Sequence, residues 1–304
     1  YYAGGASLST AALGAFFDPN YEGDGLKIQE VIKRGPFAVK KNEVTAGCII
    51  EKIDGEAIKA GKDYNALLDG KAGKNVRLTI KNTKGKTFDL TIKAISQGDQ
   101  QELLYKRWVD RNRAIVDSVS KGRIAYVHVK AMNSESFRTV YSELLSDKNR
   151  NKDAVIVDER HNGGGWLHDD LCTLLSGKQY QEFVPHGKVV GKDPFNKWTK
   201  PSCVLICEDD YSNGHGFPWV YKELGIGKLI GAPVAGTMTA VWWETLMDRS
   251  LVFGIPQVGC RDMRGTFGEN TTLQPDIEVY NSPEDYITGH DTQLIRAVEE
   301  MMKK

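Results

Sequence analysis

Short runs of alternating apolar and polar residues fill the first third of the chain. Their two-residue period is typical of half-buried β-strands. The runs are LKIQEVI at 26–32, CIIEKIDG at 48–55, VRLTIKN at 76–82 and TFDLTIK at 87–93. Between the second and third runs, the i, i+3, i+4 spacing of Tyr64, Leu67 and Leu68 predicts one short helix. The pattern predicts a small, mostly β module over residues 25–95.

After Ser96 the pattern changes to long amphipathic segments that alternate with apolar runs. Residues 101–120 (QELLYKRWVDRNRAIVDSVS) predict a charged amphipathic helix. Apolar strands are expected at 124–129, 153–159, 203–208 and 228–234, with helices between them. Strands and helices that alternate in this way indicate a parallel sheet with crossover helices, whose sites lie at the carboxyl ends of the strands. We expect the second domain to begin near residue 97.

Composition narrows the class of protein. A chain of 304 residues exceeds the usual size of one domain, which favours two cores. Forty basic and forty acidic residues cancel, and no Lys/Arg-dense segment occurs. We therefore expect no nucleic-acid partner, since the electrostatic footprint for one is missing. No apolar run approaches the ~20 residues that span a bilayer, so no membrane span is expected.

The five cysteines form no CxxC pair and no short-period framework. This spacing argues against a disulfide scaffold and against a structural zinc site. Cys203 and Cys207 have the pattern of buried apolar residues in or beside a strand. We expect no metal and no cofactor from the sequence.

Two loops after predicted strands carry the candidate chemistry. Ser212 follows one strand and precedes a predicted helix, where a hydroxyl can be exposed for nucleophilic attack. The same position suits an ordinary helix N-cap. Gly163, Gly164 and Gly165 follow another strand, and their uncovered N–H groups suit either an oxyanion hole or a flexible turn. No Gly-Lys-Ser/Thr follows them, which disfavours a nucleotide-binding loop.

Histidines near these loops suggest two further interpretations, a base for Ser212 and a metal site. His215 lies three residues after Ser212 and is a candidate base, or else a histidine outside the site. His161, His168, Asp169 and Asp170 suggest a metal hydrolase. The His-x6-His spacing does not place both rings on one helical face, so we rank this reading second.

Several stretches together resemble the C-terminal half of the tricorn-type serine peptidases, relatives of the C-terminal processing peptidases. The stretches are GGASLSTAALGAFFD, DERHNGGG, YSNGHGFPWVYKELGIGKLIGAPVAGTM, ENTTLQPDIEV and GHDTQLIRAVE. Their order and spacing also match, and they cover nearly the whole chain. The resemblance implies an α/β catalytic core of the ClpP/crotonase-like type with an inserted, mostly β PDZ domain. We expect residues 1–22 to belong to the catalytic region, 23–96 to form the PDZ domain and 97–304 to form the peptidase core.

The resemblance also implies roles for individual residues. Ser212 would be the nucleophile, and Glu269 in the ENTTLQPD stretch would match the glutamate of the catalytic tetrad. The oxyanion hole would use the backbone N–H of Asn213 together with Gly164 or Gly165. A Ser-Lys dyad is disfavoured, because GAPVAGTMTAVWWE contains no lysine.

The base is expected outside this sequence. Tricorn-type peptidases use a histidine just before the PDZ domain, which would lie a few residues before Tyr1. We therefore expect this chain alone to be inactive. The competing hypothesis is a catalytically inactive scaffold that binds peptides through its PDZ domain.

The PDZ reading predicts a carboxylate-binding loop at Gly23, Asp24, Gly25 and Leu26. Expected partners are peptides or unfolded proteins, and the resemblance implies a homo-oligomer for the full-length protein. Residues 179–200, with Phe183, Phe195 and Trp198, are a candidate pocket wall. Compartment stays open between a bacterial cytoplasm and periplasm.

Overall fold

A computed structural model describes residues 9–40 and 43–303. The chain divides into two compact units, with the division between Asp110 and Arg111. The division falls within helix α1 (Gln97–Val119). Each unit has its own hydrophobic core, as expected from the length of the chain.

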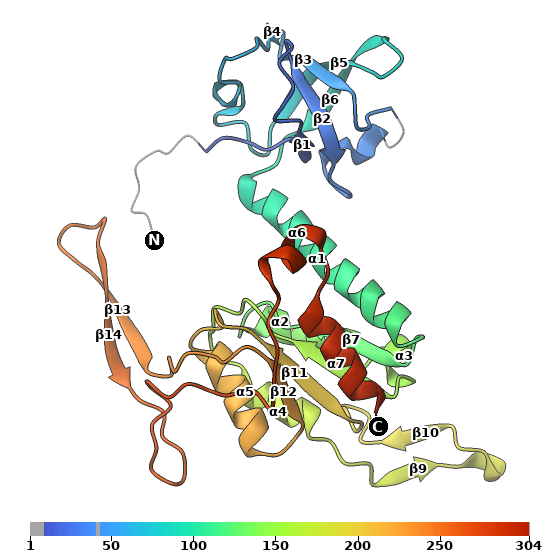
Figure 1. The fold of residues 1–304 in the computed structure, drawn as a ribbon, viewed down its shortest axis with the longest axis vertical. Helices are drawn as coiled ribbons and strands as arrows, with labels where there is room; N and C mark the ends of the chain where they lie inside the picture. Colours follow the sequence, from blue (N-terminus) through green and yellow to red (C-terminus); the bar gives the residue numbers. More distant parts are fainter. Residues whose placement is uncertain (1–8, 41–42, 304) are drawn as a thin grey trace. The chain divides into compact units, whose positions relative to one another are not determined.

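The first unit is a β-sheet module (Figure 1). Its strands are β1 (Ala15–Phe17), β2 (Leu26–Val31), β3 (Ile49–Ile53), β4 (Glu56–Ala57), β5 (Asn75–Lys81) and β6 (Thr87–Lys93). They pair antiparallel in the order β1-β2-β3-β5-β6, with β4 on β3. Two 3₁₀ helices, η1 (Pro36–Lys40) and η2 (Asn65–Leu68), complete it.

The four predicted strands of this unit are confirmed as β2, β3, β5 and β6, and the alternation of buried and exposed residues is clearest in β5 and β6. Val76, Leu78 and Ile80 alternate with exposed or half-buried residues along β5 and lie fully inside the core. The short helix predicted near Tyr64 is the 3₁₀ helix η2. Residues before the predicted PDZ start also join this unit, since Ala15 in β1 pairs with Val31 in β2.

The second unit alternates strands and helices. Its strands are β7 (Ile124–His128), β8 (Ala154–Asp158), β9 (Gln181–Phe183), β10 (Gly191–Asp193), β11 (Ser202–Ile206), β12 (Lys228–Gly231), β13 (Ala240–Thr245), β14 (Val252–Val258) and β15 (Ile277–Glu278). Its helices are α2 (Ser134–Leu144), α3 (Asp147–Arg150), α4 (His168–Leu175), α5 (Asn213–Glu223), α6 (Pro283–Thr288) and α7 (Thr292–Met302), with a 3₁₀ turn η3 (Pro185–Gly187).

A five-stranded parallel sheet forms the centre of this unit. Its order is β15-β12-β11-β8-β7, and every neighbouring pair is parallel. All residues of β7, β8 and β11 are buried, which explains their continuous apolar sequence. Val155 and Val157 pack with helices α2, α4 and α5, whereas α7 lies against the strands with Leu294 and Val298 buried (Figure 1).

A buried ionic network joins β8 to the start of α7. The Arg160 guanidinium donates to both carboxylate oxygens of Asp158 at 2.9 and 2.7 Å, and to Asp291 at 2.9 Å. Tyr126 donates to Asp158 at 2.8 Å. Burial alone would raise the pKa of Asp158, but the charge and hydrogen bonds of Arg160 outweigh it and hold that pKa below its usual range.

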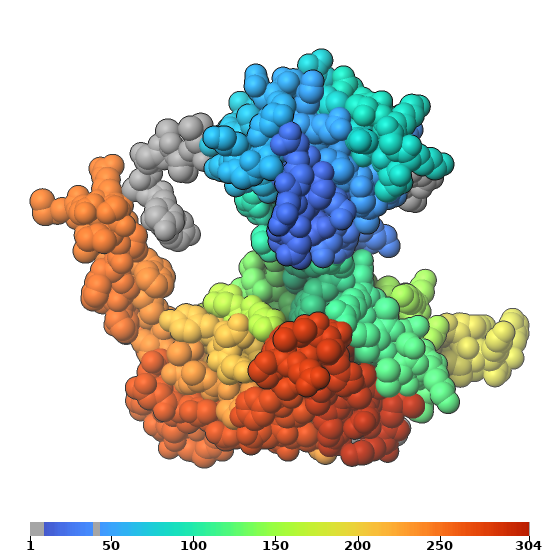
Figure 2. All heavy atoms as spheres, turned by 45° about the horizontal axis from the view of Figure 1, so that its top comes forward, coloured from blue at the N-terminus to red at the C-terminus, as the bar shows by residue number. Residues whose placement is uncertain are grey.

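Two β-hairpins extend from the central sheet of this unit. The β9–β10 hairpin is the first, and the β13–β14 hairpin, orange in Figure 2, is the second. Trp243 and Phe253 on the second hairpin are 66 % and 57 % exposed. Among the described residues, no helix combines the length and apolar character needed to cross a membrane.

Replacing Arg160 by methionine should destabilise the second unit by about 3–5 kcal/mol, because Asp158 would remain buried without its partner. Chemical denaturation followed by circular dichroism measures the change. Arg123→Met is the matched control, since Arg123 and its partner Asp153 are both exposed, and it should cost less than about 1 kcal/mol. Equal losses in both variants would contradict the assigned role of the network.

Candidate active site

The pairing of β8 with β11 brings the two candidate loops together. The strands are parallel neighbours, with Asp158 opposite Leu205, so residues 159–165 and 207–212 leave the sheet at the same edge. Backbone and side-chain hydrogen bonds join the loops directly. Tyr211 N–H donates to Asn162 at 2.9 Å, and Asn162 N–H donates to Asp210 Oδ1 at 3.1 Å. Ser212 and the glycine run therefore lie side by side.

Ser212 has an unusual backbone conformation. Its φ is 57° and its ψ is −117°, a region that residues other than glycine rarely adopt. The Ser212 N–H donates to Thr237 Oγ1 at 3.0 Å, and the Ser212 carbonyl accepts from His215 and Gly216. These three bonds hold the conformation in place. Strain of about 1–3 kcal/mol at one residue is typical of functional sites.

The Ser212 side chain does not act as a helix cap. Ser212 occupies the N-cap position of α5, yet its hydroxyl makes no capping hydrogen bond. Ser212 lines a pocket of about 410 Å³ together with Thr239 and Trp243. The conformation resembles that of a nucleophile held on a sharp turn between a strand and a helix.

Gly164 touches the turn that carries Ser212. A Cβ on Gly164 would lie 2.7 Å from Ser212 Cβ and 3.0 Å from the Asn213 nitrogen, and its φ is 91°. Only glycine allows this approach. The Gly164 N–H donates to Asn162 Oδ1 at 2.9 Å and is therefore already engaged. Within residues 9–40 and 43–303, the N–H groups of Gly165 and Asn213 have no hydrogen-bond acceptor.

The Asn213 side chain fixes its own backbone beside the glycines. It is buried, and its Oδ1 accepts from the backbone N–H of Leu167 at 2.8 Å and of His168 at 3.2 Å. Its Nδ2 lies 2.9 Å from His168 Nδ1. Asn213 thereby satisfies two backbone donors at the start of α4, where no side chain of α4 itself does so. The first turn of α5 is anchored as a result.

Glu269 lies behind the pocket wall. Its carboxylate accepts from the Thr239 N–H at 2.8 Å, and Thr239 lines the Ser212 pocket. Hydrogen bonding from Thr239, helped by His215, holds the Glu269 pKa below its usual range. Glu269 is therefore an ionised carboxylate that positions the wall next to Ser212.

His215 is turned away from Ser212. Its imidazole is 1 % exposed and lines a separate pocket of about 260 Å³ with Gly268 and Thr271. Burial lowers the His215 pKa, although Thr271 and Glu269 oppose this change. Neither ring nitrogen meets hydrogen-bond geometry with any described residue. The arrangement favours His215 as a neutral, packed histidine over a base for Ser212.

The aromatic residues beside Ser212 differ from the predicted ones. Trp166, Tyr211, Trp219 and Trp243 line its pocket. Trp198 is instead buried in the core, Phe195 stacks with Arg150 at 3.6 Å, and Phe183 lies on β9. The sequence analysis did not predict these pocket residues. Trp243 reaches the Ser212 pocket from the β13–β14 hairpin, and the sequence of that hairpin carries no local signal for the site.

The predicted PDZ loop lies in the first unit. The Gly25 N–H donates to Ile58 at 3.0 Å, and the Asp24 carboxylate pairs with Lys59 at 2.8 Å. Leu26 begins β2, which pairs with both β1 and β3. Strand addition by a peptide requires a free edge, and β2 is not an edge strand of this sheet.

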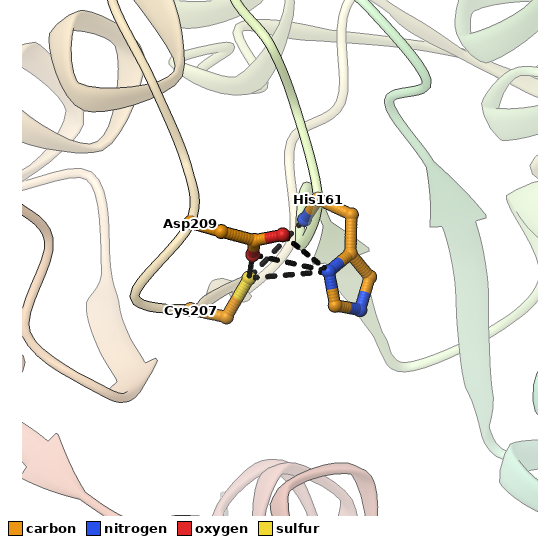
Figure 3. A group of neighbouring side chains, drawn as sticks. All are labelled: His161, Cys207 and Asp209. Carbon is orange, nitrogen blue, oxygen red and sulfur yellow. Dashed lines mark hydrogen bonds and ion pairs between the residues drawn. The ribbon is translucent and has the colours of Figure 1, made fainter.

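A second group of side chains lies between the same two loops (Figure 3). His161 Nδ1 is 3.0 Å from Asp209, and Cys207 Sγ donates to Asp209 at 2.8 Å. Burial, with Asp210 and Asp209 nearby, raises the pKa of the Cys207 thiol. Cys207 is buried as predicted, but it faces polar partners and not the core alone. His168 contacts Asn213 and lies outside the His161 group, so the metal site shared by His161 and His168, which the spacing had disfavoured, is not formed.

The sheet and the loops at its carboxyl edge define an α/β core with the features of a hydrolase site. The profile of peptidase family S41 matches residues 123–279, and that of the tricorn protease PDZ domain matches residues 21–97. The chain therefore belongs to peptidase family S41, a family of serine proteases that act on peptides, and it carries a tricorn-type PDZ domain.

Individual relatives agree with this assignment. The tricorn protease of Thermoplasma acidophilum is 29% identical over 259 residues, which cover 85% of this chain and 24% of the relative. A tricorn protease homolog of Saccharolobus solfataricus is 28% identical in a match of 310 aligned positions, which covers 98% of this chain and 28% of the relative. A crystal structure of the tricorn protease superposes with a TM-score of 0.83 at 25% identity, over 97% of this chain and 29% of that chain. The chain thus spans about a quarter of these relatives.

Replacing Gly164 by alanine should destabilise the second unit by about 2 kcal/mol or more, because the new Cβ would combine a positive φ with a collision against Ser212. Urea unfolding measures the loss. Gly163→Ala is the matched control, since its Cβ would meet nothing within 4 Å, and it should change stability by less than about 0.5 kcal/mol. A neutral Gly164→Ala variant would refute the close approach.

Proposed function

We propose that this chain carries the nucleophile of a serine peptidase, and that Ser212 attacks the peptide carbonyl. The observation that carries the proposal is the Ser212 conformation. Its φ of 57° is held by backbone hydrogen bonds, the residue lines a pocket, and its hydroxyl makes no capping hydrogen bond. A structural N-cap needs no such strain, whereas a nucleophile at the end of a buried strand does.

The oxyanion formed on attack requires preorganised donors. We assign this role to the backbone N–H groups of Gly165 and Asn213, because they flank the Ser212 turn and have no acceptor among the described residues. Gly164 contributes by its missing side chain, since its own N–H already donates to Asn162. Glu269 keeps the Thr239 wall in position beside the nucleophile.

The chemistry follows from these roles. Ser212 Oγ forms a bond to the carbonyl carbon while its proton passes to a base, and the carbonyl oxygen becomes the oxyanion. Collapse expels the amine, which takes the proton from the base, and leaves an acyl group on Ser212. Water then attacks the acyl carbon and gives a proton to the base. The bond from Ser212 Oγ to the acyl carbon breaks, Ser212 takes the proton back from the base, and the second product leaves as a carboxylic acid. Peptides and unfolded proteins are the proposed substrates.

We propose that the base is a histidine that lies before Tyr1 in the full-length protein. The proposal rests on the resemblance to tricorn-type peptidases and on the position of His215, which opens into a different pocket from Ser212. On this view the chain alone reacts slowly, since a serine hydroxyl without its base is a weak nucleophile.

The finer assignments of fold and organisation are part of the same proposal. The proposed limits at residues 23–96 and 97–304 lie close to the profile matches at 21–97 and 123–279, although β1, within the predicted segment 1–22, pairs with β2 in the sheet of the first unit. The parallel sheet with helices on both faces agrees with a ClpP/crotonase-like core. Two further predictions remain untested. One is a homo-oligomer of the full-length protein, and the other is peptide binding by the loop of Gly23, Asp24, Gly25 and Leu26.

A fluorophosphonate probe tests the nucleophile. We expect the chain extended upstream to include its nearest histidine to be labelled at least about a thousandfold faster than the chain without it. Ser212→Ala in the extended chain should abolish labelling, and Ser250→Ala, which removes an exposed turn serine, should leave it unchanged. Labelling is read by intact mass.

Three outcomes would count against all or part of the proposal. Labelling that survives Ser212→Ala places the nucleophile elsewhere. Two folded chains that both remain unlabelled would favour the inactive, peptide-binding alternative. Equal labelling of both chains, lost with Ser212→Ala, would keep the nucleophile and overturn the upstream base.

A further inference from the structure

The group formed by His161, Cys207 and Asp209 has the composition of a metal site. The three donor atoms, an imidazole nitrogen, a sulfur and a carboxylate oxygen, all lie within 4.8 Å of one another (Figure 3). They come from two loops at the carboxyl edge of the sheet, His161 after β8 and the other two after β11. We propose that these three side chains bind a divalent transition-metal ion, with Zn²⁺ as the best-fitting ion.

The distances between the donor atoms suit a single small ion. His161 Nδ1 lies 3.0 Å from both Asp209 oxygens, and Cys207 Sγ lies 2.8 Å from Asp209 Oδ1 and 3.9 Å from His161 Nδ1. Zinc bonds of about 2.0–2.3 Å at tetrahedral angles place neighbouring ligand atoms roughly 3.4–3.6 Å apart. Shifts of well under an ångström in each side chain would give that spacing.

The loops hold these ligands in place without any ion. Asp210 is buried, and its carboxylate accepts from the Cys207 N–H at 2.8 Å and from the Asn162 N–H at 3.1 Å. These bonds hold the backbone of Cys207 and of Asn162, the residue that follows His161. The His161 N–H donates to Cys207 Sγ at 3.2 Å. His161 itself has a φ of 69°, which turns its ring toward the partner loop. Such outer contacts commonly set metal affinity by 10–100-fold.

The donor set selects the class of ion. A thiolate with an imidazole favours zinc and other first-row transition metals over Mg²⁺ or Ca²⁺, which prefer oxygen ligands. Binding removes the thiol proton to solvent and replaces the Cys207–Asp209 hydrogen bond by bonds to the ion. The His161 and Asp209 side chains are 51% and 62% exposed, so the remaining position of a tetrahedral ion opens to water.

The site is separate from the proposed active site but shares its loops. His161 lies before the glycine run, and Cys207 and Asp209 precede Ser212. A bound ion would therefore cross-link the two loops that present Gly165 and Ser212. The inference does not depend on Ser212 being a nucleophile, because it concerns only metal binding and loop stability.

Cobalt titration of untagged, reduced protein tests the proposal. We expect one equivalent of Co²⁺ to produce the visible bands of tetrahedral cobalt together with a near-ultraviolet thiolate-to-cobalt charge-transfer band. Zn²⁺ should displace the cobalt and remove both signals. Cys207→Ser should abolish the charge-transfer band, and His161→Asn and Asp209→Asn should each weaken binding at least about tenfold. Asparagine tolerates the positive φ at position 161.

The chain offers a matched control for each ligand. Cys260→Ser removes another cysteine, Glu208→Gln removes the neighbouring acid of the same loop, and His186→Asn alters another exposed histidine with positive φ. All three should bind cobalt as the parent does. Circular dichroism of each variant establishes that it folds. The exposed ligands His161 and Asp209 provide the test if Cys207→Ser does not fold.

Thermal unfolding provides a second readout. Saturating Zn²⁺ should raise the unfolding temperature of the parent chain, because the ion binds the folded state selectively, and should raise it less in His161→Asn. Absence of a charge-transfer band in the parent, or a band that persists in Cys207→Ser or disappears in Cys260→Ser, would overturn the site. Loss of Ser212 labelling with intact cobalt binding would separate a failure of the proposed function from a failure of the metal site.

Discussion

The parallel pairing of β8 with β11 is the interaction on which the rest of the second unit depends. All ten residues of the two strands are buried, so register and direction are fixed by a core that tolerates no slippage. Because the strands run the same way, the loops that follow them meet at one edge. Ser212, the glycine run and the His161 group all owe their positions to this pairing, although they are far apart in the sequence.

Strain at the edge of the sheet is tolerated because its surroundings are rigid. Ser212 keeps a positive φ only while Thr237 and the first turn of α5 hold its backbone polar groups. Asn213 extends that support to α4 through two backbone donors. Gly164 allows the two loops to approach because it has no side chain, and any Cβ there would push the loops apart. Stability and the backbone conformation of Ser212 are therefore coupled in a few neighbouring residues.

Two buried carboxyl groups in this unit have different roles. Asp158 pairs with Arg160 within the fold, and Asp210 holds two loops together. Asp158 is ionised because Arg160 faces it directly. Burial instead raises the pKa of Asp210 to about 8, and its oxygens accept two backbone N–H groups from the two loops. Asp210 thus joins the loop of Asn162 to that of Cys207. Burial opposes the ionised form of this carboxyl, and the two N–H donors offset part of that cost.

The sequence by itself determined the principal strands and helices of both units and their order along the chain. Period-two alternation predicted strands such as β5, and continuous apolar runs predicted the buried strands β8 and β11. It also marked Ser212 and the glycine run, because unusual residues directly after strands are visible in one dimension. These features are local, and local spacing carries them.

Only the tertiary structure decided which residues meet. Strand order placed β11 beside β8, and this brought Cys207 and Asp209 to His161, a group with no spacing signature. The β13–β14 hairpin supplied Trp243 to the pocket in place of the predicted Phe195. The structure also shows that the Gly164 N–H donates to Asn162, whereas the N–H groups of Gly165 and Asn213 have no acceptor in the part of the chain that the structure describes. Such contacts depend on the pairing of strands and on the direction of side chains, which residue spacing does not encode.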